Sequence, residues 1–405
     1  MAISQGIAKT LRLKRQASKG VLAGPTGGQI MRRNNSTFAL KKEAYTTESE
    51  MTSRRQILSS RHGTRSVDGK LNGIFTPGTY ADILSALLMR DFTAIAPVVG
   101  ASITIAGAGP YTLTRAAGSW LADGFKIGTL TRLTAGAFAA GNLNSNLVVV
   151  GVTALVLTVV TVNRAVLTAE GPIAAATVTV PGKMTFVPEV GFTNVYYTAE
   201  EFYPDQPFSE RNLDVKFTQA AISMPGSGNS TIDFTAMGLD QTQDTTAYFT
   251  APAIETTSDA LVGAGGALII GGVTQANVTD FSMTIDGSGT AADASLGRNI
   301  KADIFMGIVK VSGTLTSYFE NMTLANNFLN EVRTQIVLAA TAGSLPNSEA
   351  VVISLANADM SSSDPDDVAT GLKRTYNFSA IFNAGGGAAL ATNATTITIQ
   401  DTLAP

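Results

Sequence analysis

The sequence predicts a mainly β chain that contains two copies of one β-sandwich-plus-helix unit and a small inserted all-β module. Three observations lead to this expectation. Many short stretches alternate apolar and polar residues, which is typical of half-buried strands. One such stretch recurs about 240 residues later in a similar setting, and an Ala/Thr/Val-rich segment of different texture separates the two.

The first copy starts after residues 1–35, which are rich in Gly, Gln, Ser and basic residues and are expected to form an extended arm. Residues 37–41 are expected to form a strand and residues 43–65 a long polar loop. The strand expected at residues 67–75 places alternate side chains on one face: Val67, Gly69, Leu71, Gly73 and Phe75. A helix is expected at residues 80–89, with one apolar stripe formed by Ile83, Leu84, Leu87 and Leu88.

The inserted module begins at residue 113 and gives the division 1–35, 36–112, 113–186 and 187–405. Its longest apolar run, residues 147–162, has 16 residues, fewer than the 18 or more expected of a membrane helix. The run is rich in Val and Thr and is interrupted by Gly151. We therefore expect two buried strands there and no membrane association.

The remainder of the chain resumes the alternating pattern of the first section. A long loop is expected at residues 239–265 and a second short helix at residues 324–332. Strands are expected at residues 213–224, 231–237, 267–270, 278–285, 309–319, 335–339, 351–355, 375–381 and 395–400.

The internal repeat rests on two matching stretches, residues 67–75 (VDGKLNGIF) and 311–319 (VSGTLTSYF). Each is followed by a short apolar helix and preceded by a polar loop and a Phe-bearing strand. The identities are few, but the matching order of elements indicates a tandem duplication.

Composition argues against most enzyme classes. The chain has 0 Cys and 1 His, which removes thiol chemistry and argues against His-rich metal sites and most Ser/His/Asp arrangements. The Gly-rich stretch at 263–266 lacks the Lys-Ser/Thr of a phosphate loop, and the acidic stretch at 286–293 lacks the ligand pattern of a calcium loop. We therefore predict no catalytic residue, no metal site and no cofactor.

Charge is unevenly distributed along the chain. Residues 1–70 hold 14 Lys and Arg against four acids, a net charge of +10, and the remainder holds 14 against 27, a net charge of −13. Such polarity suggests head-to-tail assembly, in which a positive surface meets a negative one. A nucleic-acid-binding arm is the rival interpretation, but residues 1–35 contain no aromatic side chain to stack on bases.

Several motifs, in a shared order, resemble the tail tube proteins of long-tailed bacteriophages. They are RRQ at 54–56, RHGTRSVDG at 61–69, GIFTPGTYAD at 73–82, MRDF at 89–92, GSWLADGF at 118–125, MPGSG at 224–228, TIDF at 231–234, DIFMG at 303–307 and VSG at 311–313. The resemblance covers residues 35–385.

The resemblance implies a structural subunit of a virion tail, assembled in the bacterial cytoplasm. Such subunits form stacked rings, in which sheets of neighbouring copies join into one inner β-barrel through which DNA is ejected. Some members carry two units per chain and close rings as trimers with pseudo-sixfold symmetry, whereas single-unit members form hexamers. The internal repeat points to the trimer, and the sequence leaves trimer against hexamer open. The implied partners are further copies, the tape-measure, tail-terminator and baseplate proteins, and DNA that passes without specific binding.

The charge asymmetry adds candidate residues for contacts between rings or subunits. We expect the basic first 70 residues to dock on the acidic remainder of another copy, and the lumen to be neutral to acidic so that it does not hold phosphates. The candidate contact residues are Lys9, Arg12, Lys14, Arg15, Arg54, Arg55, Arg61 and Arg65.

Two other functions stay open at this point. The chain could be a phage baseplate or surface protein that binds a host receptor or glycan through its β module. A β-rich polysaccharide-degrading enzyme would need clustered carboxylates with aromatic platforms, and a single Trp with scattered acids argues against it.

Overall fold

The computed structural model describes residues 4–47, 56–163, 165–320, 322–366 and 371–405. Strands dominate this part of the chain, and its two helices, α1 (Ala81–Leu87) and α2 (Thr323–Leu329), have seven residues each. The mainly β class predicted from the sequence is confirmed.

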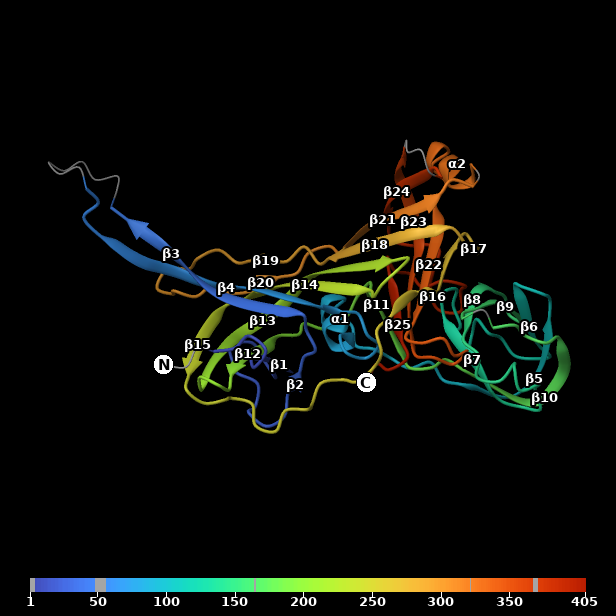
Figure 1. The fold of residues 1–405 in the computed structure, drawn as a ribbon, viewed down its shortest axis with the longest axis horizontal. Helices are drawn as coiled ribbons and strands as arrows, with labels where there is room; N and C mark the ends of the chain where they lie inside the picture. Colours follow the sequence, from blue (N-terminus) through green and yellow to red (C-terminus); the bar gives the residue numbers. More distant parts are fainter. Residues whose placement is uncertain (1–3, 48–55, 164, 321, 367–370) are drawn as a thin grey trace.

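Eight antiparallel strands form one continuous sheet that extends through both halves of the molecule (Figure 1). Its spatial order differs from the chain order because the strands of each unit return to pair with earlier ones. The order is β3 (Asn35–Thr46), β4 (Ser60–Ile74), β14 (Thr231–Gly238), β13 (Phe208–Pro225), β18 (Val278–Asp286), β21 (Lys310–Tyr318), β24 (Lys373–Ala380) and β23 (Ala350–Pro365). We call this run the main sheet.

A second layer packs beneath each half of the main sheet. The long strands β13 and β23 run from one layer into the other, so each half is a sandwich with one shared strand. Beneath the first half lie β1 (Thr10–Arg15), β2 (Gln29–Ile30), β12 (Tyr197–Tyr203) and β15 (Asp240–Asp244). Beneath the second lie β11 (Lys183–Phe186), β16 (Val262–Ile270), β17 (Val273–Gln275), β22 (Thr334–Thr341) and β25 (Thr398–Asp401). A separate pair, β19 (Thr290–Ala291) with β20 (Ile304–Phe305), lies in the connection between β18 and β21.

The two halves repeat the same strand pairings. In the first, β3 pairs with β4, β4 with β14, and β14 with β13; in the second, β18 pairs with β21, β21 with β24, and β24 with β23. In each half a short helix follows the second of these strands. The structure therefore carries the same internal repeat as the sequence stretches 67–75 and 311–319.

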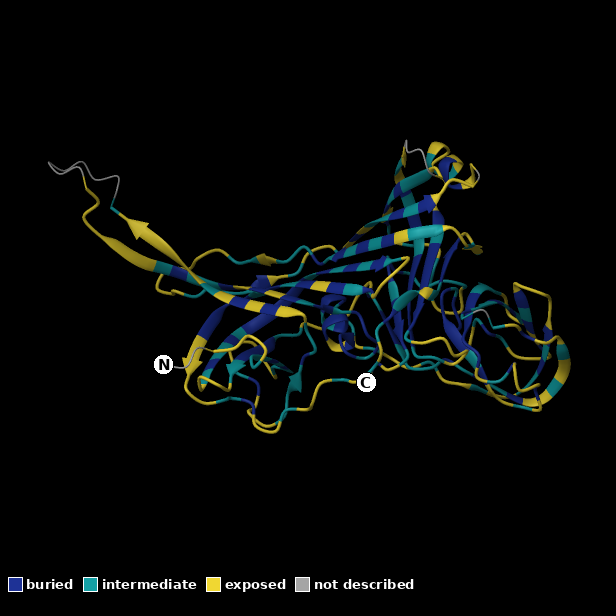
Figure 2. Ribbon diagram, viewed as in Figure 1, coloured by how far each residue is buried: buried dark blue, intermediate teal, exposed yellow. Residues whose placement is uncertain are grey.

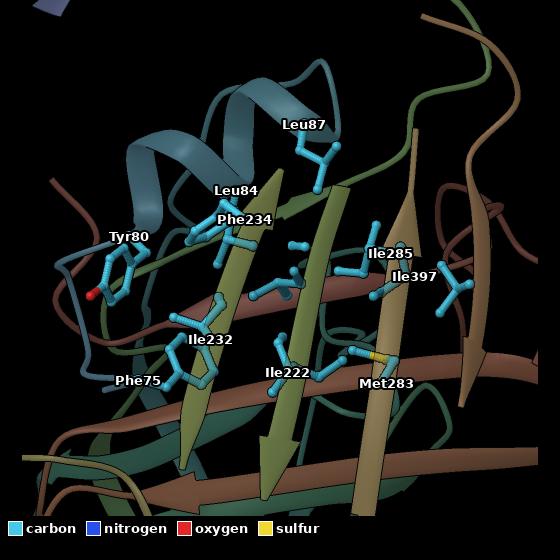
Figure 3. Close-up of a cluster of buried hydrophobic side chains, with 14 of the residues drawn as sticks. Phe75, Tyr80, Leu84, Leu87, Ile222, Ile232, Phe234, Met283, Ile285 and Ile397 are labelled. Atoms are coloured by element: carbon cyan, nitrogen blue, oxygen red, sulfur yellow. The ribbon is translucent and has the colours of Figure 1, made fainter. Parts of the chain in front are cut away.

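The apolar face of the main sheet and α1 enclose the core (Figure 3). The predicted apolar stripe of the helix is confirmed, because Ile83, Leu84, Leu87 and Leu88 are all buried. Aromatic rings join the helix to the sheet, with the Tyr80 and Phe234 ring centroids 5.5 Å apart. The alternation predicted for residues 67–75 also holds, since Val67, Gly69 and Leu71 are buried while Asp68 and Lys70 are exposed.

Residues 98–179 contain a closed six-stranded barrel at one end of the molecule (Figure 1). Its strands are β5 (Val98–Ala106), β6 (Tyr111–Arg115), β7 (Leu130–Ala135), β8 (Leu147–Val152), β9 (Val156–Thr161) and β10 (Glu170–Thr179). The two strands predicted within residues 147–162 are confirmed as β8 and β9. Trp120 and Phe125 are fully buried in its core, with their ring centroids 5.0 Å apart.

The barrel is packed firmly against the second half of the molecule. Leu130 and Val148 share an apolar cluster with Val337 and Val352. The amide of Gln400 also bridges to the barrel, because its Oε1 accepts from the Leu130 N–H at 2.7 Å and its Nε2 donates to the Leu130 carbonyl at 3.0 Å.

The structure differs from the sequence expectations in four places. The inserted module was expected to start at residue 113, whereas the first barrel strand, β5, starts at Val98. The loop predicted at 43–65 is wrong, because β3 extends to Thr46 and β4 begins at Ser60. Residues 43–46 and 60–62 are exposed, so no alternation marked them. The loop predicted at 239–265 contains β15 and the start of β16. Residues 10–15, expected in an extended arm, form β1 and pair with β12.

The last strand ties the C-terminus to the entry of α1. Asp401 is 2% exposed, and its carboxylate accepts from the N–H of Gly78 at 2.7 Å and of Leu403 at 2.8 Å. Burial raises the pKa of Asp401 to about 6, against the opposing effect of these two hydrogen bonds.

Gly313→Ala is expected to destabilise the main sheet. A Cβ at this position would collide with the Ser282 carbonyl oxygen and would lie 2.6 Å from the Phe378 ring. Overpacking of this kind costs about 1–3 kcal/mol. The thermal unfolding temperature of the unassembled chain should fall, whereas Gly141→Ala, which meets nothing within 4 Å, should leave it nearly unchanged. Equal unfolding temperatures for the two variants would contradict the close approach of β18 and β21.

Asp401 should make the chain less stable as the pH rises from 4 to 7. Because its folded-state pKa lies above its unfolded value of 3.8, the folded state binds more protons between pH 3.8 and 6. The stabilisation is complete below pH 3.8 and is lost as the pH rises through 6, a change of about 3 kcal/mol. Urea unfolding across this range should show the free energy of unfolding falling as the pH rises. Asp401→Asn should remove the contribution of Asp401 to that fall. The exposed Asp293→Asn is the control; an unaltered slope in Asp401→Asn would refute the assignment.

Candidate assembly surfaces

One face of the main sheet lies opposite the core and is polar. Figure 2 shows buried and more exposed residues alternating along the strands of this sheet. Along each strand buried apolar residues alternate with partly exposed polar ones. The polar side chains are mostly short hydroxyl and amide groups: Thr37, Asn72, Gln219, Ser223, Thr235, Ser282, Thr284, Ser312, Thr314, Thr316, Ser362, Thr375, Asn377 and Ser379. We call this surface the polar face.

Hydrogen bonds between neighbouring strands order the polar face. The hydroxyls of Ser282 and Thr314 lie 2.7 Å apart, and those of Thr316 and Thr375 lie 3.0 Å apart. The Asn377 amide donates to the Ser362 hydroxyl at 2.7 Å. The surface is therefore a regular layer of mutually bonded small groups.

The charges on the polar face nearly balance. Four lysines stand against six aspartates, a net charge of −2. They are Lys41, Lys70, Lys310 and Lys373, with Asp68, Asp233, Asp280, Asp286, Asp359 and Asp364. Opposite charges adjoin, since Lys41 forms an ion pair with Asp68, and Lys310 lies opposite Asp286 in the strand register. The face carries no excess of positive charge that would bind phosphates.

The main sheet ends in two open edges. Within the described residues, β3 pairs only with β4, and residues 359–365 of β23 pair only with β24. Each edge therefore presents unpaired backbone N–H and C=O groups, which are a template for pairing with another strand.

The distal part of the β3–β4 hairpin, residues 41–46 and 60–62, projects from the body as a two-stranded ribbon (Figure 1). Every residue in those two ranges is exposed. Exposed apolar side chains also lie on or near the ribbon, with Tyr45 and Ile57 each 56% exposed. A two-stranded ribbon without a core is marginally stable in water, so this segment is suited to docking on another surface.

Five of the eight predicted contact residues have partners within the chain. Lys9 Nζ lies 2.6 Å from Glu201, and the Arg12 guanidinium lies 3.4 Å from Glu200. Lys14 donates to two backbone carbonyls between 2.6 and 2.9 Å away, Arg15 pairs with Asp82 and Asp91 at 2.7 and 2.8 Å, and Arg65 pairs with Asp240 at 2.8 Å.

The remaining three predicted contact residues lie between Thr46 and His62 in the sequence. Arg61 is exposed on the ribbon, and Arg54 and Arg55 lie outside the described residues. Much of the predicted attraction between the basic first section and the acidic remainder is therefore made inside one copy. Sequence alone does not distinguish attraction within a chain from attraction between chains.

The open edges were missed at the level of sequence, although a signal was present. Lys41 and Lys42 lie on one edge and Asp364 and Asp366 at the other, and all four are exposed. Extending the repeat from the matched stretches to neighbouring strands would have placed these charges at the two ends of one sheet.

Other kinds of site are not evident in the described part of the chain. No group of three or more His, Asp or Glu residues is placed there to hold a metal ion. Neither described helix is long and apolar enough to cross a membrane. The single His62 is exposed on the ribbon.

Comparison with known proteins identifies the family of the chain. A search of curated proteins finds no match. The sequence profile of a family described as phage tail tube protein matches residues 6–380, nearly the whole chain. The chain therefore belongs to the phage tail tube family and is a structural subunit of the virion tail.

Proposed function

We propose that copies of this chain close into rings and that the rings stack into a hollow tube, with the polar face lining a lumen through which phage DNA passes into the host. The observation that carries this proposal is the main sheet itself. It is continuous through both units, apolar and covered on one face, polar on the other, and open at both edges.

Ring closure follows from the two edges. They differ in sequence and lie at opposite ends of the sheet, so a contact between them is heterologous: the β23 edge of one copy meets the β3 edge of the next. A heterologous contact that closes forms a ring, and a closed sheet has no free edge. Two similar units per chain support three copies per ring, with pseudo-sixfold symmetry.

The chemistry of the polar face supports its place in the lumen. A wall rich in Lys and Arg would bind phosphates by releasing their counterions and would hold the DNA. A surface of short hydroxyl and amide groups with a net charge of −2 offers little such binding. DNA would thus pass without specific recognition.

The ribbon supports stacking. It projects beyond the sandwich that contains its own strands and buries no face within the chain. Docking on the adjacent ring would provide the partner that the ribbon lacks. Arg61 lies on the ribbon, and Arg54 and Arg55 lie in the sequence between its two strands. These three are the candidate contact residues between rings.

The remaining expectations follow from family membership. We propose the tape-measure, tail-terminator and baseplate proteins as partners, assembly in the bacterial cytoplasm, and no catalytic step. A receptor- or glycan-binding role for the barrel is the competing function, and the assembly state separates the two.

Purified chain should form hollow tubes of regular stacked rings, visible by negative-stain electron microscopy over a series of protein concentrations. End-on views should show three copies per ring, with six similar lobes. Discrete particles that do not elongate at any concentration, even when preformed tail-tip complexes are added as seeds, would contradict the tube and favour the receptor-binding function.

Reversing the charge of Arg54 and Arg55 to Glu should block stacking and leave single rings or monomers, because the segment between β3 and β4 would then repel an acidic partner surface. The matched control reverses Lys70 and Lys310, which lie on the polar face. Sedimentation and microscopy should find tubes for the control alone. Tubes of normal length in the Arg54/Arg55 variant would remove these residues from the contact between rings.

A further inference from the structure

The chain contains, within itself, an example of the contact that would join two copies. The C-terminal half of β13, in the first unit, pairs antiparallel with β18, the first strand of the second unit. In this internal junction Ala220 lies opposite Ile285, Ala221 opposite Thr284, and Ile222 opposite Met283. The junction thus fuses the two units into one sheet.

The repeated pairings give residue-by-residue equivalences between the units. Leu71 lies opposite Phe234 as Leu315 lies opposite Tyr376, which aligns β4 with β21 and β14 with β24. From these strands, β13 aligns with β23 at an offset of 143 residues, and β3 aligns with β18 at an offset of 245.

A shared irregularity supports this alignment. The register of β13 with β14 shifts between Phe217 and Gln219, and that of β23 with β24 shifts between Met360 and Ser362. The two shifts are 143 residues apart, as the alignment requires. A β-bulge at the same place in both units bends the two long strands alike.

Transferring the internal junction to the open edges gives a specific contact between copies. We propose that residues 362–365 of one copy pair antiparallel with residues 38–41 of the next, with Ser363 opposite Leu40 and Asp364 opposite Ala39. This inference rests on the proposed ring and specifies its strand register. Because β3 and β23 lie at opposite ends of the main sheet, the contact is between copies.

The backbone groups at the two edges fit this register. The Asp366 N–H donates to the Lys373 carbonyl at 2.9 Å, on the side of β24. Since N–H groups alternate along a strand, the N–H of Ser363 points to the open edge, where Leu40 of the next copy would accept it. In the internal junction the Gly226 N–H donates to the Thr279 carbonyl at 2.8 Å. By the same alternation, Ala220, which is equivalent to Ser363, directs its N–H toward β18.

Pro365 is accommodated at a position where its missing N–H has a substitute. In the proposed register Pro365 faces Phe38, whose carbonyl would otherwise lack a donor. That carbonyl already accepts a long hydrogen bond from the Gln241 side chain, at 3.4 Å. The neighbouring Ser36 carbonyl likewise accepts from Lys9 Nζ, at 2.9 Å. Residues of β3 therefore need backbone hydrogen bonds from the β23 edge of the next copy only between Phe38 and Lys41.

The charges of the two edges are complementary. Lys41 and Lys42 are exposed on β3, and Asp364 and Asp366 are exposed at the end of β23. In the proposed register Lys41 lies diagonal to Asp364 on the same face, a distance that a lysine side chain spans. The equivalent internal positions hold Asp286 and Ala221, so this charge pairing is specific to the contact between copies.

Disulfide cross-linking tests the register, because the chain has 0 Cys and every thiol is introduced. Ala39 and Asp364 would form a non-hydrogen-bonded pair, with Cα atoms about 4.5 Å apart and within disulfide reach. Ala39→Cys combined with Asp364→Cys should cross-link copies under mild oxidation, giving a non-reducing gel ladder that ends at the trimer. Lys41→Cys with Ser362→Cys is a second matched pair, should the first variant fold poorly.

The control combines Ala39→Cys with Asp366→Cys, a pair that a register shifted by two residues would bring together. In the proposed register these Cα atoms lie diagonally, about 7–8 Å apart, beyond disulfide reach. Cross-linking of the control in preference to both matched pairs would overturn the register.

Electron microscopy of the same samples separates the two levels of the argument. Tubes in which neither matched pair cross-links would overturn this junction and leave the tube function standing. Cross-linked rings that never stack would support the junction and count against the tube. Absence of both rings and cross-links would overturn the proposed function together with the junction.

Discussion

The antiparallel pairing of β13 with β18 is the interaction on which the rest of the structure depends. Each unit alone would be a sandwich with open edges on both sides. Joining the units consumes one edge of each and leaves two unlike edges, at β3 and at the end of β23. The same pairing aligns the polar faces of both units into one surface, while the apolar faces share one core.

The electrostatics of the chain separates into two parts with different roles. Lys9 and Arg12 pair with the buried Glu201 and Glu200, and these pairs hold β1 against the body of the molecule. The charges of the sheet edges and ribbon are exposed and have few partners beyond Lys41 with Asp68. Net charge along the sequence mixes both kinds, which explains why the asymmetry suggested assembly but selected mostly residues that act within the chain.

Sequence patterns predicted many of the elements in which one face is buried, although β1, with Leu11 and Leu13 buried, was not among them. Residues 67–75 and the stripe from Ile83 to Leu88 carry the periods of a strand and a helix because they contact the core. The distal hairpin gave no such signal because both of its faces are exposed, and β15 is too short and too polar to be distinguished from a loop. The two open edges depend on long-range pairing between strands, which no local pattern records, although the repeat contained the information needed.

An exposed sheet edge must avoid unwanted pairing before assembly and still pair correctly afterwards. Pro365 removes a donor from one edge, and side chains of Lys9 and Gln241 occupy two carbonyls of the other. These features shorten the length of free edge with which an unrelated strand could pair. The backbone groups left free lie beside lysines on the β3 edge and beside aspartates on the β23 edge. Two copies of the same edge therefore repel each other, and unlike edges attract. The same residues that discourage aggregation of free chains would thereby favour head-to-tail contact, which is the contact that a closed ring requires.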